Sequence, residues 1–133
     1  MTVQHFVYAL GKVESNNTPY GAFGDGGRAM GQWQIHPDAR DTYQRLLGIN
    51  ATLGETWDSY IYRLVTLFYF HYSQLGLSVP EVAMTWHLGH ISHESDADWD
   101  VSYNDRFLVA LGWATRRSFF ARIRNWLSRK RKR

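Results

Sequence analysis

A long apolar segment constrains the fold more than any other feature of this sequence. Between residues 55 and 75, apolar side chains fall on most sides of a helix. A helix that is apolar all round is normally buried in the middle of a domain. No apolar run in the chain approaches the roughly 20 residues that span a bilayer. We therefore expect this segment to be a central helix around which the other elements pack.

The rest of the chain predicts shorter helices and one small β element. Helical spacing of apolar residues, or a proline that can begin a helix, marks each helical segment. Residues 20–35 hold five glycines, which suit tight turns and a small hairpin better than a helix. The expected fold class is mainly α (α+β), a helical domain with one β-hairpin. Besides 55–75, helices are expected at 3–15, 37–47, 80–90 and 103–115.

Composition predicts one domain and a basic tail. The chain has 133 residues and no cysteine, so one modest core must be held by packing alone. Residues 116–133 hold nine of the 15 Lys and Arg and no acid, which leaves six basic and 12 acidic residues before them. We divide the chain into one folded domain, 1–115, which the motifs below predict to be catalytic, and a cationic amphipathic tail, 116–133.

Two short motifs surround the glycine-rich segment. "ESNNTP" ends the first predicted helix, and "AMGQWQIHP" follows the glycines. Together they resemble the soluble lytic transglycosylase and goose-type lysozyme family. That family has a Glu-Ser pair at a helix end and then a Gly-x-x-Gln-hydrophobic-x-Pro pattern. The matching residues here are Glu14, Ser15, Gly31, Gln34, Ile35 and Pro37.

Two weaker motifs extend the resemblance to about residue 115. "TWHLGH" stands where the family has an alanine-tyrosine-asparagine-alanine-glycine block, with Trp86 for the tyrosine and His87 for the asparagine. Tyr103, in "YNDRF", matches a tyrosine that opens the next helix. A histidine keeps the ability to donate and accept a hydrogen bond, but it departs from the family pattern.

The resemblance implies a lysozyme-like fold that cleaves peptidoglycan. The bond would be the β-1,4 linkage between N-acetylmuramic acid and N-acetylglucosamine, with Glu14 as general acid and base and no cofactor. The expected partner is the glycan strand, bound by a monomer. The residues expected to contact substrate are Ser15, Met30, Gly31, Trp33, Gln34, Trp86, His87 and Tyr103.

The chemistry of Glu14 sets a condition on its surroundings. A glycosidic oxygen leaves only when it is protonated, so the acid must still hold its proton near neutral pH. Burial raises the pKa of a carboxyl because it disfavours the charged form. The apolar side chains expected to bury Glu14 are Phe6, Tyr8, Met30 and Trp33.

A second carboxylate decides between two routes. A lytic transglycosylase needs only the glutamate, which takes a proton from the muramic acid C6 hydroxyl and yields a 1,6-anhydro product. A hydrolase would use a second acid, and Asp25 is the acid inside the glycine-rich segment. We favour transglycosylation, because glycines flank Asp25 and predict an exposed turn.

The sequence does not favour a metal site. His87, His90 and His93 are three residues apart, whereas zinc sites on helices prefer a spacing of four. An acidic loop from Asp96 begins like a calcium-binding loop, but it lacks the glycine at position 6 and the glutamate at position 12. We expect a solvated acidic loop and no metal.

The tail has the composition of a cationic interfacial helix. We expect it to bind an anionic membrane or lipopolysaccharide; alternatively, its apolar stripe packs back onto the domain. Its charge alone could attract nucleic acid, but nothing in the body indicates base reading. The basic residues proposed for the anionic surface are Arg116, Arg117, Arg122, Arg124, Arg129 and Lys130.

The start of the chain lacks the features of a signal peptide. We expect the protein to be made in a host cytoplasm and to act on the bacterial cell wall in phage-induced lysis. A different class of function stays open, namely a non-catalytic, wall-binding protein that permeabilises membranes through its tail.

Overall fold

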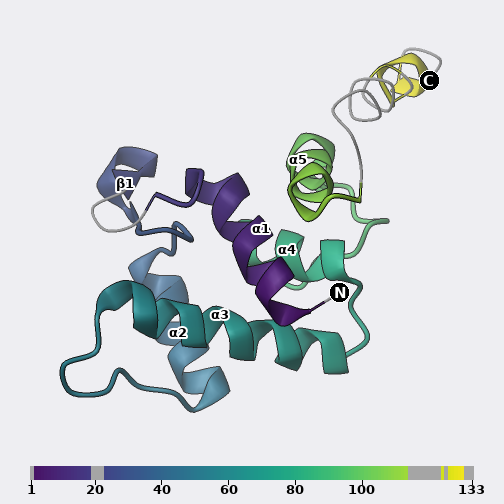
Figure 1. Cartoon of the computed structure of the whole chain (residues 1–133). Coiled ribbons are helices and arrows are strands. Elements are labelled where there is room, and N and C mark those ends of the chain that lie inside the picture. Colours follow the sequence, from purple (N-terminus) through teal and green to yellow (C-terminus); the bar gives the residue numbers. More distant parts are fainter. Residues whose placement is uncertain (1, 19–22, 114–123, 125, 131–133) are drawn as a thin grey trace.

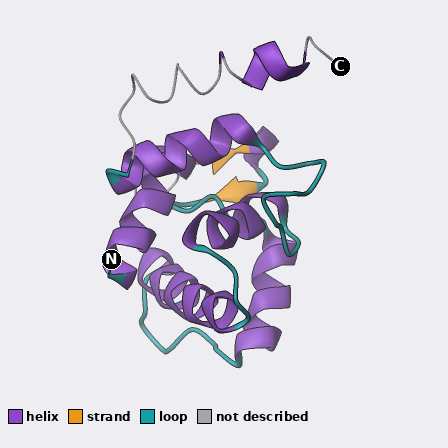
Figure 2. Cartoon of the chain, turned by 90° about the vertical axis from the view of Figure 1, so that its right-hand side faces the viewer, coloured by secondary structure: helices purple, strands orange, loops and turns teal. Residues whose placement is uncertain are grey.

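The computed structural model describes residues 2–18, 23–113, 124 and 126–130. This part of the chain is mainly helical with one two-stranded antiparallel sheet, as the sequence predicts (Figure 1, Figure 2). In chain order the elements are α1 (Val3–Ser15), β1 (Phe23–Gly24), the 3₁₀ turn η1 (Asp25–Gly27), β2 (Ala29–Met30), α2 (Pro37–Leu47), α3 (Trp57–Gln74), α4 (Val79–Leu88) and α5 (Val101–Leu111).

Helix α3 is the central helix that its apolar sequence predicts. It contacts α1, α2 and α4, and Figure 1 shows α1 running across it. The side chain of Thr56 caps its first turn by accepting a hydrogen bond from the Ser59 amide. The α3 side chains buried in the core are Tyr60, Ile61, Leu64, Val65, Phe68 and Tyr72.

Aromatic contacts join the helices across the core. The Phe68 ring on α3 lies 4.8 Å from the Tyr43 ring on α2 and 5.1 Å from the Trp86 ring on α4. The Phe6 ring on α1 lies 5.7 Å from the Phe107 ring on α5. Such pairs add to the apolar area they bury. These contacts pack α2 and α4 against α3, and α1 against α5. The core of this cysteine-free chain is therefore held by packing, as expected.

Helices α4 and α5 end two and four residues before their predicted last residues, and in both cases a glycine explains the difference. Helix α4 ends at Leu88 because Gly89 takes a left-handed conformation (φ 81°), and α5 ends at Leu111 because Gly112 does the same (φ 78°). Helix α5 also begins two residues before Tyr103, because the side chain of Asp100 caps it.

The glycine-rich segment forms the predicted hairpin. Phe23 pairs with Met30 and Gly24 with Ala29, and η1 closes the turn between the strands. Asp25 is left-handed (φ 51°) although it carries a side chain, and the next two residues, both glycines, also have positive φ. The hairpin is short, and an isolated bridge between Met30 and Ile35 extends it toward α2.

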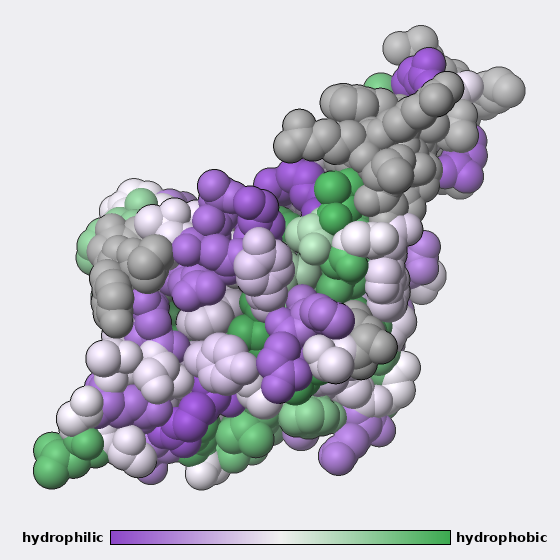
Figure 3. All heavy atoms as spheres, in the orientation of Figure 1, coloured by the Kyte–Doolittle hydropathy of each residue, from purple (hydrophilic) through white to green (hydrophobic). Residues whose placement is uncertain are grey.

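The outer surface is mixed in character. On the face shown in Figure 3, hydrophilic residues surround smaller groups of hydrophobic ones. In the tail, Arg124, Arg129 and Lys130 are helical and exposed. Arg116, Arg117 and Arg122, also predicted to bind an anionic surface, lie outside the described residues.

Candidate active site

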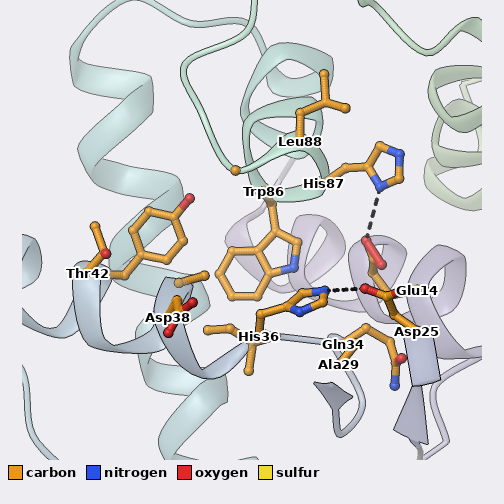
Figure 4. Close-up of a pocket in the computed structure, with 14 residues that line it drawn as sticks. Glu14, Asp25, Ala29, Gln34, His36, Asp38, Thr42, Trp86, His87 and Leu88 are labelled. Carbon is orange, nitrogen blue, oxygen red and sulfur yellow. Dashed lines mark ion pairs between the residues drawn. The ribbon is translucent and has the colours of Figure 1, made fainter. Parts of the chain in front are cut away.

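A cleft of about 700 Å³ lies between the end of α1, the hairpin, α2 and the end of α4. Figure 4 shows Glu14 and His87 on one side of the view and Asp38 and Thr42 on the other, with Trp86 between them. Three carboxylates and two histidines line the cleft, and none of the described Lys or Arg residues does so. Its size suits a small ligand such as one or two sugar rings.

Glu14 lies in the last turn of α1, where the sequence predicts it. The helix stops because Asn16 is left-handed (φ 55°) and its amide bonds the Gly11 and Lys12 carbonyls. The Ser15 hydroxyl donates to the Gln32 carbonyl at 2.6 Å and so fastens the helix end to the loop after the hairpin. Ser15 thus positions the helix end and lies outside the cleft lining.

The surroundings of Glu14 give it the proton affinity of a general acid. Its side chain is 12% exposed. Burial raises its pKa from 4.5 to about 7, against weaker lowering effects of the Tyr103 hydroxyl and the Arg106 charge. Tyr8, expected to help bury it, is 58% exposed, so that prediction is wrong.

The two weaker motifs meet beside Glu14. The Tyr103 hydroxyl donates to Glu14 Oε1 at 3.0 Å. The His87 ring is stacked on the Tyr103 ring, with centroids 3.8 Å apart and planes at 6°. His87 Nδ1 lies 3.9 Å from Glu14 Oε1. The structure therefore brings His87 of α4 and Tyr103 of α5 together with the carboxyl of α1.

The two tryptophans expected to contact sugar are mainly structural. The Trp33 indole N–H donates to the Val7 carbonyl at 2.9 Å, and the Trp86 indole N–H donates to the Trp33 carbonyl at 2.9 Å. Trp33 is 3% exposed and lies outside the cleft lining, so the structure places it in the core, and its role as a sugar contact stays a prediction. Trp86 does line the cleft, but it is only 8% exposed.

Gln34 both lines the cleft and holds the base of the hairpin. Its side-chain N–H donates to the Gly31 carbonyl at 2.8 Å, and its backbone is left-handed (φ 51°). A Cβ on Gly31 (φ 80°) would lie 2.9 Å from the Trp57 indole nitrogen, so this position requires glycine. Met30 and Gly31 build the hairpin base and are not part of the cleft lining, contrary to their prediction as substrate contacts.

Asp25 lines the same cleft, but its side chain is much more exposed to solvent than that of Glu14. Its side chain is 67% exposed, and it forms an ion pair with His36 Nε2 at 3.4 Å. The pair joins the hairpin to the residue that precedes α2. Solvent screens an ion pair this exposed, so it contributes at most about 1 kcal/mol to stability.

Sequence reasoning missed four polar residues of the site. Asp38 and His36 line the cleft, Arg106 acts on the charge of Glu14, and Asp100 binds His87 Nε2 at 3.2 Å. We had assigned Asp100 to a solvated loop. An aspartate directly before the segment "VSY" could have predicted a helix N-cap at Asp100, since Asp is a preferred N-cap residue.

The described residues contain no group of three His, Cys, Asp or Glu side chains arranged to hold a metal ion. Among the same residues, no helix combines the length and the apolar character needed to cross a bilayer.

Comparisons with known proteins returned no relative. No family model, no curated protein and no solved structure matches this chain. The arguments for function therefore rest on the residues and geometry of the cleft.

Proposed function

We propose that this protein cleaves the β-1,4 bond between N-acetylmuramic acid and N-acetylglucosamine in peptidoglycan, with Glu14 as general acid. The observation that carries the proposal is one largely buried carboxyl, with its pKa raised to about 7, in a cleft of about 700 Å³. An acid whose pKa lies near the working pH both holds a proton and can release it. The resemblance of the residues around Glu14 to the soluble lytic transglycosylase and goose-type lysozyme family supports a peptidoglycan glycan as the substrate.

The proposed first step is protonation of the glycosidic oxygen by Glu14. The Tyr103 hydroxyl donates to Oε1, which leaves the other carboxyl oxygen to carry the proton toward the substrate. As the bond breaks, the carboxylate that forms keeps the Tyr103 hydrogen bond and the nearby Arg106 charge. Both interactions favour the charged form, so they stabilise Glu14 after the proton has left.

We favour the transglycosylase route, in which the muramic acid C6 hydroxyl attacks and a 1,6-anhydro sugar forms. This route needs one carboxyl. The 67% exposure of Asp25 supports it, because that side chain keeps most of its contact with water.

Hydrolysis is the second candidate, because Asp25 does line the same cleft as Glu14. A retaining hydrolase would hold the two carboxyl groups about 5–5.5 Å apart, and an inverting one about 6.5–9.5 Å apart. In that case water would add to the sugar and leave a reducing end.

The experiment is digestion of purified murein followed by mass spectrometry of the released fragments. We expect 1,6-anhydro end groups from the unaltered protein and no fragments from Glu14→Gln. Reducing ends alone would replace the transglycosylase with a hydrolase. Fragment release by Glu14→Gln at the unaltered rate would refute the proposal, because acid catalysis would then not come from Glu14.

We further propose that the tail holds the enzyme on an anionic surface when it reaches the wall during phage-induced lysis. Arg124, Arg129 and Lys130 are exposed there, and each basic residue near an anionic surface contributes about 1 kcal/mol. Removing residues 116–133 should weaken binding to anionic vesicles more than cleavage of soluble glycan fragments. Equal loss of both would indicate that the tail packs on the domain.

The non-catalytic alternative makes a separable prediction. If the tail alone permeabilises membranes, Glu14→Gln will cause leakage of anionic vesicles as well as the unaltered protein does, and neither protein will release murein fragments.

A further inference from the structure

We propose that His87 is a second proton-transfer residue of the cleft and that Asp100 is the residue that positions it. The inference rests on the proposed cleavage by Glu14 and assigns the path of the second proton. It starts from a histidine at a position where the resemblance would place an asparagine.

Both ring nitrogens of His87 face carboxyl groups. Nε2 lies 3.2 Å from Asp100 Oδ2, and Nδ1 lies 3.9 Å from Glu14 Oε1. The ring face is stacked on Tyr103 at 3.8 Å, which prevents the imidazole from turning freely. If Nε2 carries the proton that Asp100 accepts, Nδ1 is left as a proton acceptor beside Glu14. The side chain is 31% exposed and lines the cleft, so substrate can reach it.

Asp100 is itself held in place by the helix it caps. Its Oδ1 accepts from the Tyr103 amide at 3.0 Å, while Oδ2 faces His87. Burial acts to raise the pKa of Asp100, but the hydrogen bonds from Tyr103 and His87, together with the charges of His87 and Arg106, outweigh it, and the net pKa is lowered. Asp100 is therefore ionised at neutral pH and can stabilise an imidazolium. One residue thus caps α5, orients His87 and supplies a charge.

Every proton and bond in the proposed step is accounted for. Glu14 gives its proton to the glycosidic oxygen, and the bond from that oxygen to the sugar C1 breaks. The attacking hydroxyl, from the muramic acid C6 or from water, forms a bond to C1 and gives its proton to His87 Nδ1. The imidazolium then returns a proton to the Glu14 carboxylate, which restores both groups. The 3.9 Å between Nδ1 and Oε1 leaves a short path for this return.

A simpler role for His87 would be a hydrogen bond to substrate, which the asparagine of the resemblance could also make. His87→Asn separates the two roles, because it keeps a donor and an acceptor but cannot carry a proton. We expect kcat on soluble glycan fragments to fall about 100-fold, within the range of general acid–base catalysis, with KM within about threefold. An unchanged kcat in His87→Asn would overturn the proposal.

Asp100 is tested with variants that keep the helix cap. Serine and asparagine both cap helices well, so Asp100→Ser and Asp100→Asn should leave α5 intact. We expect Asp100→Ser to lower kcat about tenfold with an unchanged KM. Nitrogen-15 NMR of the His87 ring should show one tautomer, with the proton on Nε2, in the unaltered protein and a mixture of tautomers in Asp100→Ser. Asp98→Asn is the matched control, because Asp98 pairs with His90 at 2.9 Å where both side chains are more than half exposed. A single Nε2–H form that persists in Asp100→Ser, with full kcat, would refute the positioning role.

The two proposals fail differently. If the unaltered protein releases no murein fragments, the proposed cleavage falls, and this inference falls with it. If the unaltered protein cleaves, Glu14→Gln does not, and both His87→Asn and Asp100→Ser keep full kcat, the cleavage stands and the relay is refuted.

Discussion

Two of the three carboxyl groups that line the cleft differ sharply in their exposure to solvent. Glu14 is 12% exposed and has its pKa raised to about 7, whereas Asp25 is 67% exposed and pairs with a histidine. The same chemical group is thus largely removed from water, with a raised pKa, at one place and remains in contact with water at the other. The difference teaches that the packing around a carboxyl group, rather than its residue type, sets how far it is removed from water.

The difference in exposure follows from the structural element on which each carboxyl group lies. Glu14 stands on a helix that packs against α3 and α5, so neighbouring elements exclude water from it. Asp25 lies in the turn of the hairpin beside Gly26 and Gly27, where an added Cβ would meet nothing within 4 Å. A turn of this kind has no layer above it to bury a side chain.

The prediction with the largest expected effect compares the activities of variants at Glu14 and Asp25. Glu14→Gln should lower the rate of murein cleavage by about 10³-fold, because general acid catalysis contributes about 10²–10⁴. Asp25→Asn should stay within about threefold of the unaltered rate. Fragment release from murein, followed at fixed enzyme concentration, measures both. A 10²-fold loss in Asp25→Asn would place both carboxyl groups in the reaction.

The second test is the dependence of stability on pH. Because folding raises the pKa of Glu14 from 4.5 to about 7, the folded state binds its proton more tightly than the unfolded state. The folded protein therefore loses stability as pH rises from 4.5 to 7, by about 3 kcal/mol in total. Glu14→Gln should remove this loss and be more stable by up to that amount at pH 8, with no gain near pH 4.

Urea unfolding at both pH values measures this effect, and Asp25→Asn is the control. That variant should show a difference below about 1 kcal/mol at either pH, since its ion pair is exposed. Equal stability of Glu14→Gln and the unaltered protein at pH 8 would contradict the burial argument.

A third test compares the base of the hairpin with its tip. Gly31→Ala should lower the free energy of unfolding by about 2 kcal/mol, because a positive φ and a contact with the Trp57 indole act together. Gly27→Ala, also at positive φ but with open space around it, should cost about 1 kcal/mol. Thermal unfolding of the two variants measures the difference, and equal losses would show that the contact with Trp57 contributes nothing.

The smallest expected effect concerns the hydrogen bond to Glu14. Tyr103→Phe removes a donor that favours the carboxylate, so the pKa of Glu14 should rise. The alkaline limb of the kcat/KM profile should then move to higher pH, and stability at pH 8 should fall by about 1–2 kcal/mol. Tyr62→Phe on α3 is a matched control, since that ring is 40% exposed, and it should shift neither quantity. An alkaline limb that moves to lower pH in Tyr103→Phe would contradict the role of Tyr103 as a donor that favours the Glu14 carboxylate.

Much of the fold was predictable because its signals are local. Apolar spacing located α1 and α3, the glycine run located the hairpin, and Pro37 located the start of α2. The errors fell where a single residue ends a helix, as at Gly89 and Gly112. Local steric preferences are encoded by neighbouring residues, so a single sequence carries them.

The site was predictable in part. Glu14 and Gln34 line the cleft as expected, and His87 and Tyr103 stand beside Glu14. Trp33 lies in the core and outside the cleft lining. The sequence could not show this, because an aromatic residue near a motif suits a sugar face and a core equally well, and only packing distinguishes them.

The sequence by itself determined a helical, disulfide-free domain with one carboxyl at a helix end before a glycine-rich turn. Only the tertiary structure decided that this carboxyl is largely buried where it lines a cleft, and that Asp100, 86 positions further on, contacts the ring of His87 that lies beside it. The reason is physical. Proton affinity depends on the water, charges and donors within a few ångströms, and those neighbours come from segments that are far apart in the chain.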